Sequence, residues 1–243
     1  MRRKMNLRII AKRAGEKILQ VLFPLRCPVC DEIVQPAGEK ICLECMDKLR
    51  IITPPWCMRC GKKLTEEGEF CPECRVKERG FARGRALYEY TSAAQAIYRF
   101  KYGGRQEYAD YFGEQIVEYL GEFIEKVQPD GLVPVPLHRS RRRKRGYNQA
   151  ELLARAIGSR LDIPVYDKLV FRTKNTVPLK QLNARERQNN LKKAFNVAQN
   201  DVKLKVLIII DDIYTTGSTI EEMSRVLREA GVENIYFVTL AAA

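Results

Sequence analysis

The chain has 243 residues, a formal net charge of +13 and a pI near 9.4. This length is enough for one ample hydrophobic core and a small additional module. The basic charge favours polyanionic partners, such as nucleic acid, phosphorylated metabolites or anionic lipid. No apolar run reaches the roughly 18–20 residues that a membrane-spanning helix needs, which argues against an integral membrane protein.

Residues 1–24 form a basic segment with apolar residues at helical spacing, including Leu7, Ile10, Ala14 and Ile18. Charges interrupt the apolar positions, unlike the apolar region of a signal peptide. We expect a basic amphipathic helix that either makes peripheral contact with an anionic membrane surface or packs on the protein itself. The lack of a signal-peptide pattern indicates a cytoplasmic protein.

All eight cysteines fall in four CxxC pairs within residues 25–78. The two sulfurs of a pair suit one ion and four thiolates close a tetrahedral zinc site, so we expect two structural zinc ions. A secreted disulfide framework, the alternative, disagrees with the missing signal peptide. The spacing leaves sequential and cross-braced pairing equally open. The expected ligands are Cys27, Cys30, Cys42, Cys45, Cys57, Cys60, Cys71 and Cys74.

A charged stretch at residues 75–85 marks the predicted boundary of a second domain, residues 79–243. Within it, apolar patterning predicts strands alternating with helices, which is typical of an α/β fold with a mostly parallel sheet flanked by helices. Strands are predicted at 86–90, 132–136, 165–166, 169–172, 195–197, 206–210 and 235–240, and helices at 93–101, 107–127, 148–160 and after residue 217.

Two carboxylates, Asp211 and Asp212, follow the strand at 206–210, and a hydroxyl-rich loop comes next. Backbone N–H groups at a helix start, with neighbouring hydroxyls, can surround a phosphate. Carboxylates only accept hydrogen bonds, so they suit ribose hydroxyls or a hydrated Mg²⁺. The segment therefore predicts a ribose-phosphate site. The expected phosphate ligands are Thr215, Thr216, Gly217, Ser218 and Thr219.

Ser218 and Thr219 each precede a glutamate by three residues, Glu221 and Glu222. Two overlapping capping boxes are therefore expected at the start of the helix that follows the loop.

Two further segments carry charge suited to anions. A basic loop at 139–145 follows a predicted strand, where open α/β sheets bind ligands. The polar segment at 181–191 is expected to be either a lid or a plain surface helix. The residues expected to contact pyrophosphate or DNA are Lys101, Arg139, Arg141, Arg142, Arg143, Arg145, Arg185 and Arg187.

The sequence neighbours of one histidine and three aromatic residues suggest a role for each. His138 is the chain's one histidine and is expected to be a structural loop residue. Trp56 is expected to pack within the cysteine module, with base stacking as the alternative. Tyr102 and Tyr147 are both candidates for stacking on a base.

The strand with its two aspartates and the sequence TTGST resembles the phosphoribosyl-pyrophosphate (PRPP) signature of type I phosphoribosyltransferases. Together with the CxxC pairs, Lys101–Gly104 and the PVPLH and RGYNQA sequences of Pro134–Ala154, it resembles the ComF family of competence-associated proteins. The resemblance implies zinc fingers joined to a phosphoribosyltransferase-like domain, with Mg²⁺ bound alongside PRPP. It also implies a role in uptake of single-stranded DNA during natural transformation, at the inner face of the cytoplasmic membrane.

Three functions are consistent with these features. The leading hypothesis is a DNA-uptake accessory protein that binds PRPP or a related ribose phosphate and single-stranded DNA. The second is an active phosphoribosyltransferase, a pentosyl-transferring enzyme, acting on a base or nucleotide. The third is a scaffold whose zinc module docks a DNA helicase or uptake channel. Turnover, the acceptor substrate, the oligomeric state and the DNA-binding surface stay open.

Overall fold

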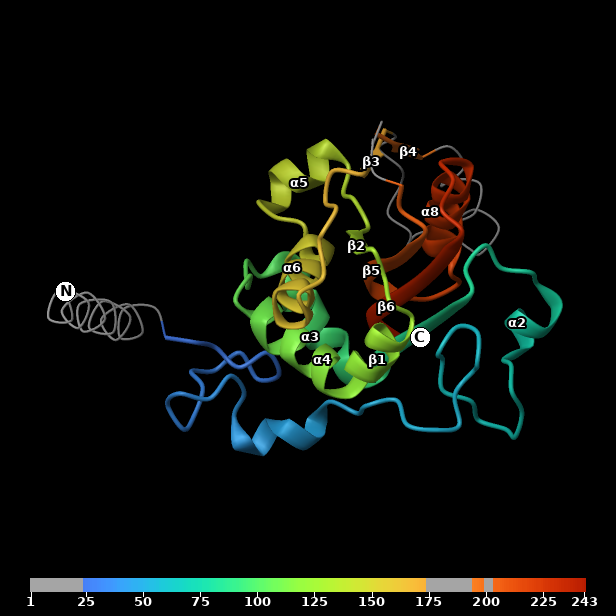
Figure 1. The fold of residues 1–243 in the computed structure, drawn as a ribbon. Coiled ribbons are helices and arrows are strands. Elements are labelled where there is room, and N and C mark those ends of the chain that lie inside the picture. Colours follow the sequence, from blue (N-terminus) through green and yellow to red (C-terminus); the bar gives the residue numbers. More distant parts are fainter. Residues whose placement is uncertain (1–23, 174–193, 199–202) are drawn as a thin grey trace, which may run out of the picture. The chain divides into compact units, whose positions relative to one another are not determined.

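The computed structural model describes residues 24–173, 194–198 and 203–243 (Figure 1). Almost all of the predicted N-terminal helix, together with Arg185 and Arg187, lies outside these ranges. The fold divides into two compact units, Met1–Lys48 and Leu49–Ala243. The domain boundaries expected after residues 24 and 78 stay predictions. No helix in the described ranges is long and apolar enough to span a membrane.

In residues 24–48, the part of the first unit that the structure describes, there is a 3₁₀ helix, η1 (Leu43–Lys48), and a short bridge between Arg26 and Ile33. The buried apolar residues of this part include Val34 and Ile41, together with Cys27 and Cys45. A metal ion bound to the cysteines would add folding free energy to these contacts.

The second unit is built on a four-stranded parallel sheet with the strand order β1-β6-β5-β2. These strands are β1 (Arg83–Glu89), β2 (Gly131–Pro134), β5 (Val206–Tyr214) and β6 (Asn234–Ala242). Four consecutive residues of β5, Leu207–Ile210, are fully buried, as expected for a central strand covered on both faces. The predicted parallel α/β sheet is confirmed.

Helices cover the two faces of this sheet (Figure 1). α3 (Tyr90–Tyr102), α4 (Tyr108–Lys126) and α6 (Gln149–Leu161) lie on one side, and α8 (Ser218–Glu229) lies on the other. A small antiparallel pair joins β3 (Val170–Arg172) to β4 (Phe195–Val197). The strand predicted at 165–166 is only an isolated bridge between Val165 and Leu132.

The basic segment after β2 forms a helix, α5 (Arg139–Arg145), where a loop was predicted. Arginine and lysine are good helix formers, so local propensity outweighs the repulsion of like charges. The ring Nδ1 of His138 accepts a hydrogen bond from the Ser140 N–H at 3.3 Å and caps the start of α5. Gly146, with φ of 88°, ends the helix. His138 thus has the structural role expected of it.

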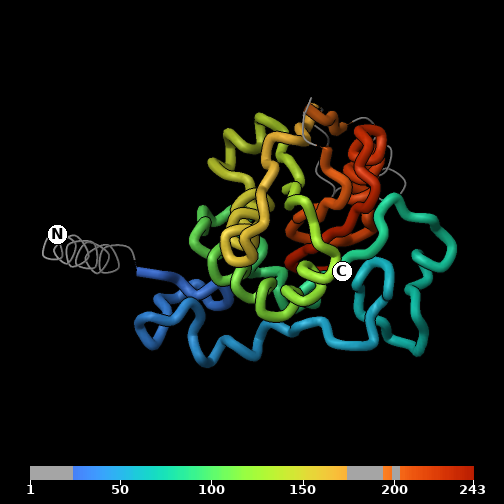
Figure 2. The backbone as a smooth tube through the Cα atoms, in the orientation of Figure 1, coloured from blue at the N-terminus to red at the C-terminus, as the bar shows by residue number. Residues whose placement is uncertain are grey.

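The second cysteine-rich segment, residues 49–78 with Cys57, Cys60, Cys71 and Cys74, belongs to the same compact unit as the sheet (Figure 2). Backbone hydrogen bonds join it to edge strand β1: Ile52 N–H to Leu87 O at 2.8 Å, and Gly84 N–H to Arg59 O at 2.8 Å. These contacts satisfy backbone groups that a sheet edge would otherwise expose to other chains.

Gly61 allows the close approach between this segment and β1. Its φ is 72°, and a Cβ at this position would lie 2.8 Å from both Arg85 Cα and Gly84 O. Those atoms belong to the backbone of a paired strand and cannot move aside easily.

We predict that Gly61→Ala destabilises the second unit more than Gly104→Ala does. Gly104 has the same φ of 72° but nothing within 4 Å of its would-be Cβ. Gly104→Ala should therefore cost only about 1 kcal/mol of backbone strain, and Gly61→Ala roughly 1–3 kcal/mol more from overpacking. Denaturant unfolding of the two variants measures the difference, and equal losses would show that the contact with β1 does not constrain residue 61.

Candidate functional site

The first group of cysteines gathers the two CxxC pairs of the first unit. The sulfurs of Cys27, Cys30 and Cys42 all lie within 4.8 Å of one another, with Cys30 and Cys42 at 3.9 Å. Zinc–sulfur bonds of about 2.3 Å in a tetrahedron separate the sulfurs by about 3.8 Å, so these three sulfurs fit part of a zinc site. The Cys45 thiol lies outside the set of three, but burial, followed by contact with the Cys30 thiol, raises the pKa of Cys45 to about 12. Cys45 therefore remains the expected fourth ligand.

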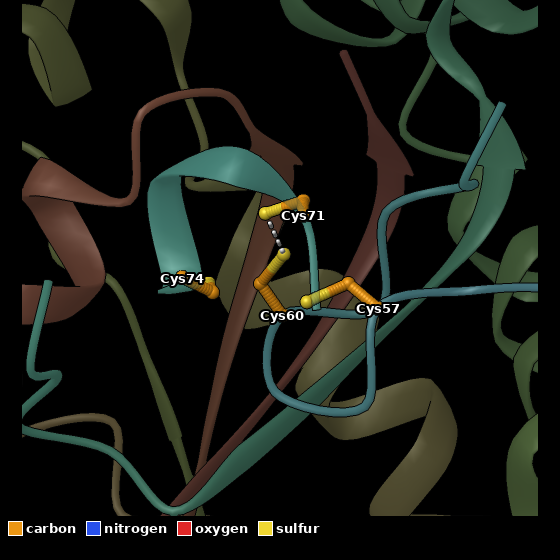
Figure 3. Close-up of side chains that lie close together, drawn as sticks. All are labelled: Cys57, Cys60, Cys71 and Cys74. Carbon is orange, nitrogen blue, oxygen red and sulfur yellow. Dashed lines mark hydrogen bonds between the residues drawn. The ribbon is translucent and has the colours of Figure 1, made fainter. Parts of the chain in front are cut away.

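The second group consists of Cys57, Cys60, Cys71 and Cys74, all buried and within 4.8 Å of one another (Figure 3). Cys71 is the N-cap of α2 (Pro72–Val76) and Cys74 lies within that helix. The sulfurs of Cys60 and Cys71 are 3.7 Å apart, again close to the tetrahedral separation. The groups thus pair the CxxC motifs sequentially, which resolves the alternative that the spacing left open. All eight thiols are free of disulfides.

Burial and crowding make the second group costly without a cation. Burial, and then repulsion from the other thiolates, raises the pKa of Cys60. Burial also opposes ionisation of Cys57, but backbone hydrogen bonds lower the pKa of Cys57 to about 7. A dication would stabilise all four thiolates at once, which makes this group a metal site in chemical terms.

Arg79 joins the second cysteine group to the predicted phosphate loop. Its side chain is only 1% exposed, and its Nη2 lies 3.6 Å from Glu73 Oε2 on α2. Its Nη1 donates a hydrogen bond to Thr216 O in the loop at 3.3 Å. Burial by itself lowers the pKa of Arg79. Interactions with Tyr214 and the Cys74 thiol outweigh burial, so the pKa of Arg79 is raised. One guanidinium therefore contacts both sites.

Tyr214, the last residue of β5, provides a second link. Its ring stacks on Phe237 at 4.8 Å and meets the edge of Phe81 at 6.3 Å. Burial, followed by the nearby Cys60 thiolate, raises the pKa of Tyr214. A Cβ on Gly217 would lie 2.5 Å from the Tyr214 hydroxyl, so only glycine allows the loop to fold against this ring.

The loop itself turns from β5 into α8. Gly217, with φ of 76°, is the N-cap of α8, and the hydroxyls of Thr216 and Ser218 hydrogen-bond to each other at 2.8 Å. Residues 215–220 and Asp211 line a small recess. A phosphate bound at this helix start would replace the bond between the two hydroxyls.

The capping boxes expected at this helix start are not formed in the described structure. The Glu221 carboxylate instead accepts a hydrogen bond from Gly80 N–H at 2.7 Å. Gly80 O in turn accepts a hydrogen bond from Arg228 Nε at 2.7 Å, so a tertiary contact replaces the local one.

The two aspartates have different surroundings. Asp212 is 4% exposed, and its carboxylate is held by Lys101 Nζ at 2.8 Å and by Gln149 Nε2 at 2.6 Å. Asp211 is half-buried and faces the recess. Burial, followed by repulsion from Asp212, raises the pKa of Asp211 to about 7. Asp211 is thus the carboxylate more available to a ligand or cation, whereas Asp212 anchors α3 and α6 to β5.

Cations gather beside Asp211. Burial, followed by repulsion from Arg141, lowers the pKa of Arg172 to about 10, and the Asp211 carboxylate opposes this change. Burial likewise lowers the pKa of Arg141, where Arg145 adds repulsion. Guanidinium groups crowded in a partly buried place suit a polyanion such as pyrophosphate.

α5 presents its charges in two directions. Arg141 and Arg145, one turn apart, lie toward this site: Arg145 hydrogen-bonds Gln149 and covers the ring of Tyr102 at 4.9 Å. Arg142 pairs with Glu151 at 3.0 Å. The exposed cations of the helix are Arg139, Arg142, Arg143 and Lys144.

The residues expected from the sequence do not include three that contact the loop or lie beside the aspartates, Arg79, Arg172 and Gln149. Gln149 is part of the RGYNQA sequence, so a signal for it was present, whereas Arg172 ends a short strand without any motif. Tyr147 is buried and its hydroxyl donates to Phe100 O, which leaves Tyr102 as the exposed aromatic beside α5. Trp56 is partly buried against the core, as expected.

Comparison with known proteins finds relatives over most of the chain. A double zinc ribbon domain matches residues 18–75, and a phosphoribosyl transferase domain matches residues 144–243. "Competence protein F" of Haemophilus influenzae is 32% identical over 228 residues, which are 91% of this chain and 98% of that protein. "Competence protein ComFC" of Bacillus subtilis is 32% identical over 204 residues, 79% of this chain and 80% of that protein. "DNA utilization protein YhgH" of Escherichia coli K12 is 30% identical over 179 residues, 72% of this chain and 78% of that protein.

A solved purine phosphoribosyltransferase from Pyrococcus horikoshii is similar at 15% identity with a TM-score of 0.33, covering 55% of this chain and 83% of that one. This likeness is too distant to add to the sequence relatives.

We predict about two zinc ions per chain by elemental analysis, four thiolates to each. Replacing Cys71 and Cys74 with serine should remove one zinc and lower the melting temperature of the sheet-containing unit, because that group lies in its core. Replacing Cys27, Cys30, Cys42 and Cys45 together should also remove only one zinc and leave that melting transition in place. Loss of both zinc ions from this second variant would contradict sequential pairing.

Proposed function

Because the chain belongs to the ComF/ComFC family of competence proteins, we propose that it binds a phosphorylated ribose at the end of β5 and assists the handling of single-stranded DNA. The names of its relatives, competence and DNA utilization proteins, support a role in DNA uptake. Such a role belongs at the inner face of the cytoplasmic membrane, beside a helicase or uptake channel. The family resemblance supports that placement.

One observation carries the ribose-phosphate assignment: a carboxylate lies between a helix start and a group of cations. Asp211 borders the recess of the TTGST loop and is close to Arg172. A phosphate at the start of α8 would leave the ribose hydroxyls to the carboxylate. The guanidinium groups of Arg172 and Arg141 would then meet the remaining phosphates. A ligand that has one phosphate for the helix start, ribose hydroxyls for the carboxylate and further phosphates for the guanidinium groups matches PRPP.

Mg²⁺ would accompany such a ligand. Oxygen atoms of one or two carboxylates and of substrate phosphates are its usual ligands, and Asp211 offers such an oxygen. When bound, the ion would supply charge neutralisation for the pyrophosphate. The chain's own residues would orient the ligand: Asp211 at the ribose, and Asp212, held by Lys101 and Gln149, as the anchor of β5.

We predict that Asp211→Asn weakens PRPP binding by about 10- to 100-fold, equivalent to about 1.5–3 kcal/mol for a lost charged hydrogen bond, without a large loss of stability. Asp212→Asn should instead lower the free energy of unfolding by about 1–3 kcal/mol, because Lys101 loses its partner. The double variant should not bind PRPP at all. Calorimetry with Mg²⁺ and PRPP measures affinity, and denaturant unfolding measures stability.

Asp162→Asn is the matched control, since Asp162 is exposed at the end of α6 with φ of 54°, a conformation that asparagine adopts readily. If Asp211→Asn bound PRPP as tightly as this control, the ribose assignment would be wrong.

The outward side of α5 is our proposed DNA surface. Arg139, Arg143 and Lys144 are exposed there and follow one another closely along a short helix. A chain of phosphates can pair with such cations without reading bases, so binding would tolerate any sequence and weaken with salt.

We predict that replacing Arg139, Arg143 and Lys144 with glutamine reduces the log–log salt slope of single-stranded DNA binding by roughly 2, at about 0.7 per lost phosphate contact. PRPP affinity should be unchanged. Replacing Arg141 and Arg145 should have the converse effect, weakening PRPP with little change in the salt slope. Fluorescence anisotropy over a salt series provides the slopes. If the variant with Arg139, Arg143 and Lys144 replaced had the same salt slope as the wild type, DNA would not bind at the exposed side of α5.

A further inference from the structure

A groove of about 940 Å³ lies within the second unit, apart from the TTGST loop. Three elements form it: the second cysteine-rich segment, edge strand β1 and the second half of α4. Its lining includes Trp56, Arg83, Arg85, Tyr119, Phe123 and Lys126.

Four aromatic side chains line this groove: Trp56, Tyr119, Phe123 and Tyr236. Tyr119 is 49% exposed, although a large aromatic side chain on a helix usually packs into the core. The Arg85 guanidinium lies 4.9 Å from the ring centre of Trp56 and 5.2 Å from that of Phe123. Rings and guanidinium planes at an accessible surface are the features on which unpaired bases stack.

The groove also carries unbalanced positive charge. Within the described residues, no carboxylate forms an ion pair with Arg83, Arg85 or Lys126, and Glu122 is the one acidic residue of the lining. Burial, followed by repulsion from Arg83, lowers the pKa of Arg85. A phosphate backbone would provide anions for the exposed Arg83 and Lys126, whereas an apolar helix would leave both without an anionic partner.

The groove is a separate site from the loop at the end of β5. Arg83 pairs in register with Tyr236, and Tyr236 with Ile208, three positions before Asp211 on β5. Along the strand direction alone this corresponds to about 10 Å.

We propose that this groove binds unpaired bases of single-stranded DNA, with Trp56 and Tyr119 as stacking surfaces and Arg83 and Lys126 as phosphate contacts. The choice of nucleic acid rests on the function proposed above. The groove would bind one stretch of the single-stranded DNA, and α5 would contact another.

The chain provides its own reporter, because Trp56 is its one tryptophan. The test is a titration of the full zinc-containing protein with labelled oligo-dT of about 12 nucleotides, within the roughly 4–16 that a single-strand site covers. Anisotropy of the label follows total binding, and tryptophan fluorescence follows the groove. We expect tryptophan fluorescence to change with the same midpoint as the anisotropy, and to stay constant when PRPP is added instead.

Variants on exposed positions test the same site without disturbing the core. Tyr119→Ala should weaken binding about tenfold through a lost stacking contact, and Tyr119→Phe should not. Lys126→Gln should lower the salt slope by about 0.7. Lys168→Gln is the matched control, since Lys168 is exposed and lies outside the groove lining.

Four outcomes are distinguishable. A bound oligonucleotide with coincident fluorescence change and a weakened Tyr119→Ala variant supports the groove. Binding by anisotropy with constant tryptophan fluorescence and a normal Tyr119→Ala variant overturns the groove but leaves the DNA role at α5. Absence of any anisotropy change overturns both, and a fluorescence change on adding an apolar helical peptide instead would identify a protein partner.

Discussion

The packing of the second cysteine group against the parallel sheet is the interaction on which the rest of this structure depends. Cys57, Cys60, Cys71 and Cys74 share one hydrophobic core with β5, β6 and α8. Arg79 and Tyr214 extend this core to the TTGST loop, through the Thr216 carbonyl and the Gly217 backbone. Since metal binding to such a group contributes folding free energy, a zinc ion here would also hold the loop in shape.

The loop and the carboxylates are therefore held from two sides. The cysteine group and Arg79 fix the loop, while α3 and α6 hold Asp212 through Lys101 and Gln149. Because Asp212 is fully occupied, Asp211 is the acidic group left to meet a ligand. A site of this kind keeps its geometry by packing and buried ion pairs around it. If a phosphate binds as proposed, the hydroxyls of Thr216 and Ser218 would be the groups that rearrange.

Much of this arrangement could be predicted from the sequence because its signals are local. The five apolar residues before Asp211 predict a buried strand, and four CxxC pairs predict two metal sites without any knowledge of the fold. The α/β order follows from alternating apolar patterns. In each case the pattern in the sequence and the strand, helix or metal site that it predicts involve the same residues.

The remaining features depend on contacts between distant parts of the chain. Glu221 leaves its capping role for Gly80, 141 positions away, and Gln149 reaches Asp212 across 63 positions. Arg172 joins the site because a short strand pair places it near Asp211, which no local pattern indicates. The pairing of the cysteines was open for the same reason. The run of like charges in α5 favours a loop, whereas its helix propensity and the capping by His138 favour the helix that forms.

Hydrogen exchange on the full chain tests most directly whether the second cysteine group supports the sheet and the loop. The comparison is between the wild type and the variant with Cys71→Ser and Cys74→Ser. We expect lost amide protection in β1, β6 and residues 214–219 as well as in the segment around the cysteines, because these parts share one core. Loss of protection confined to residues 57–74, with β1 and the loop unchanged, would contradict this dependence.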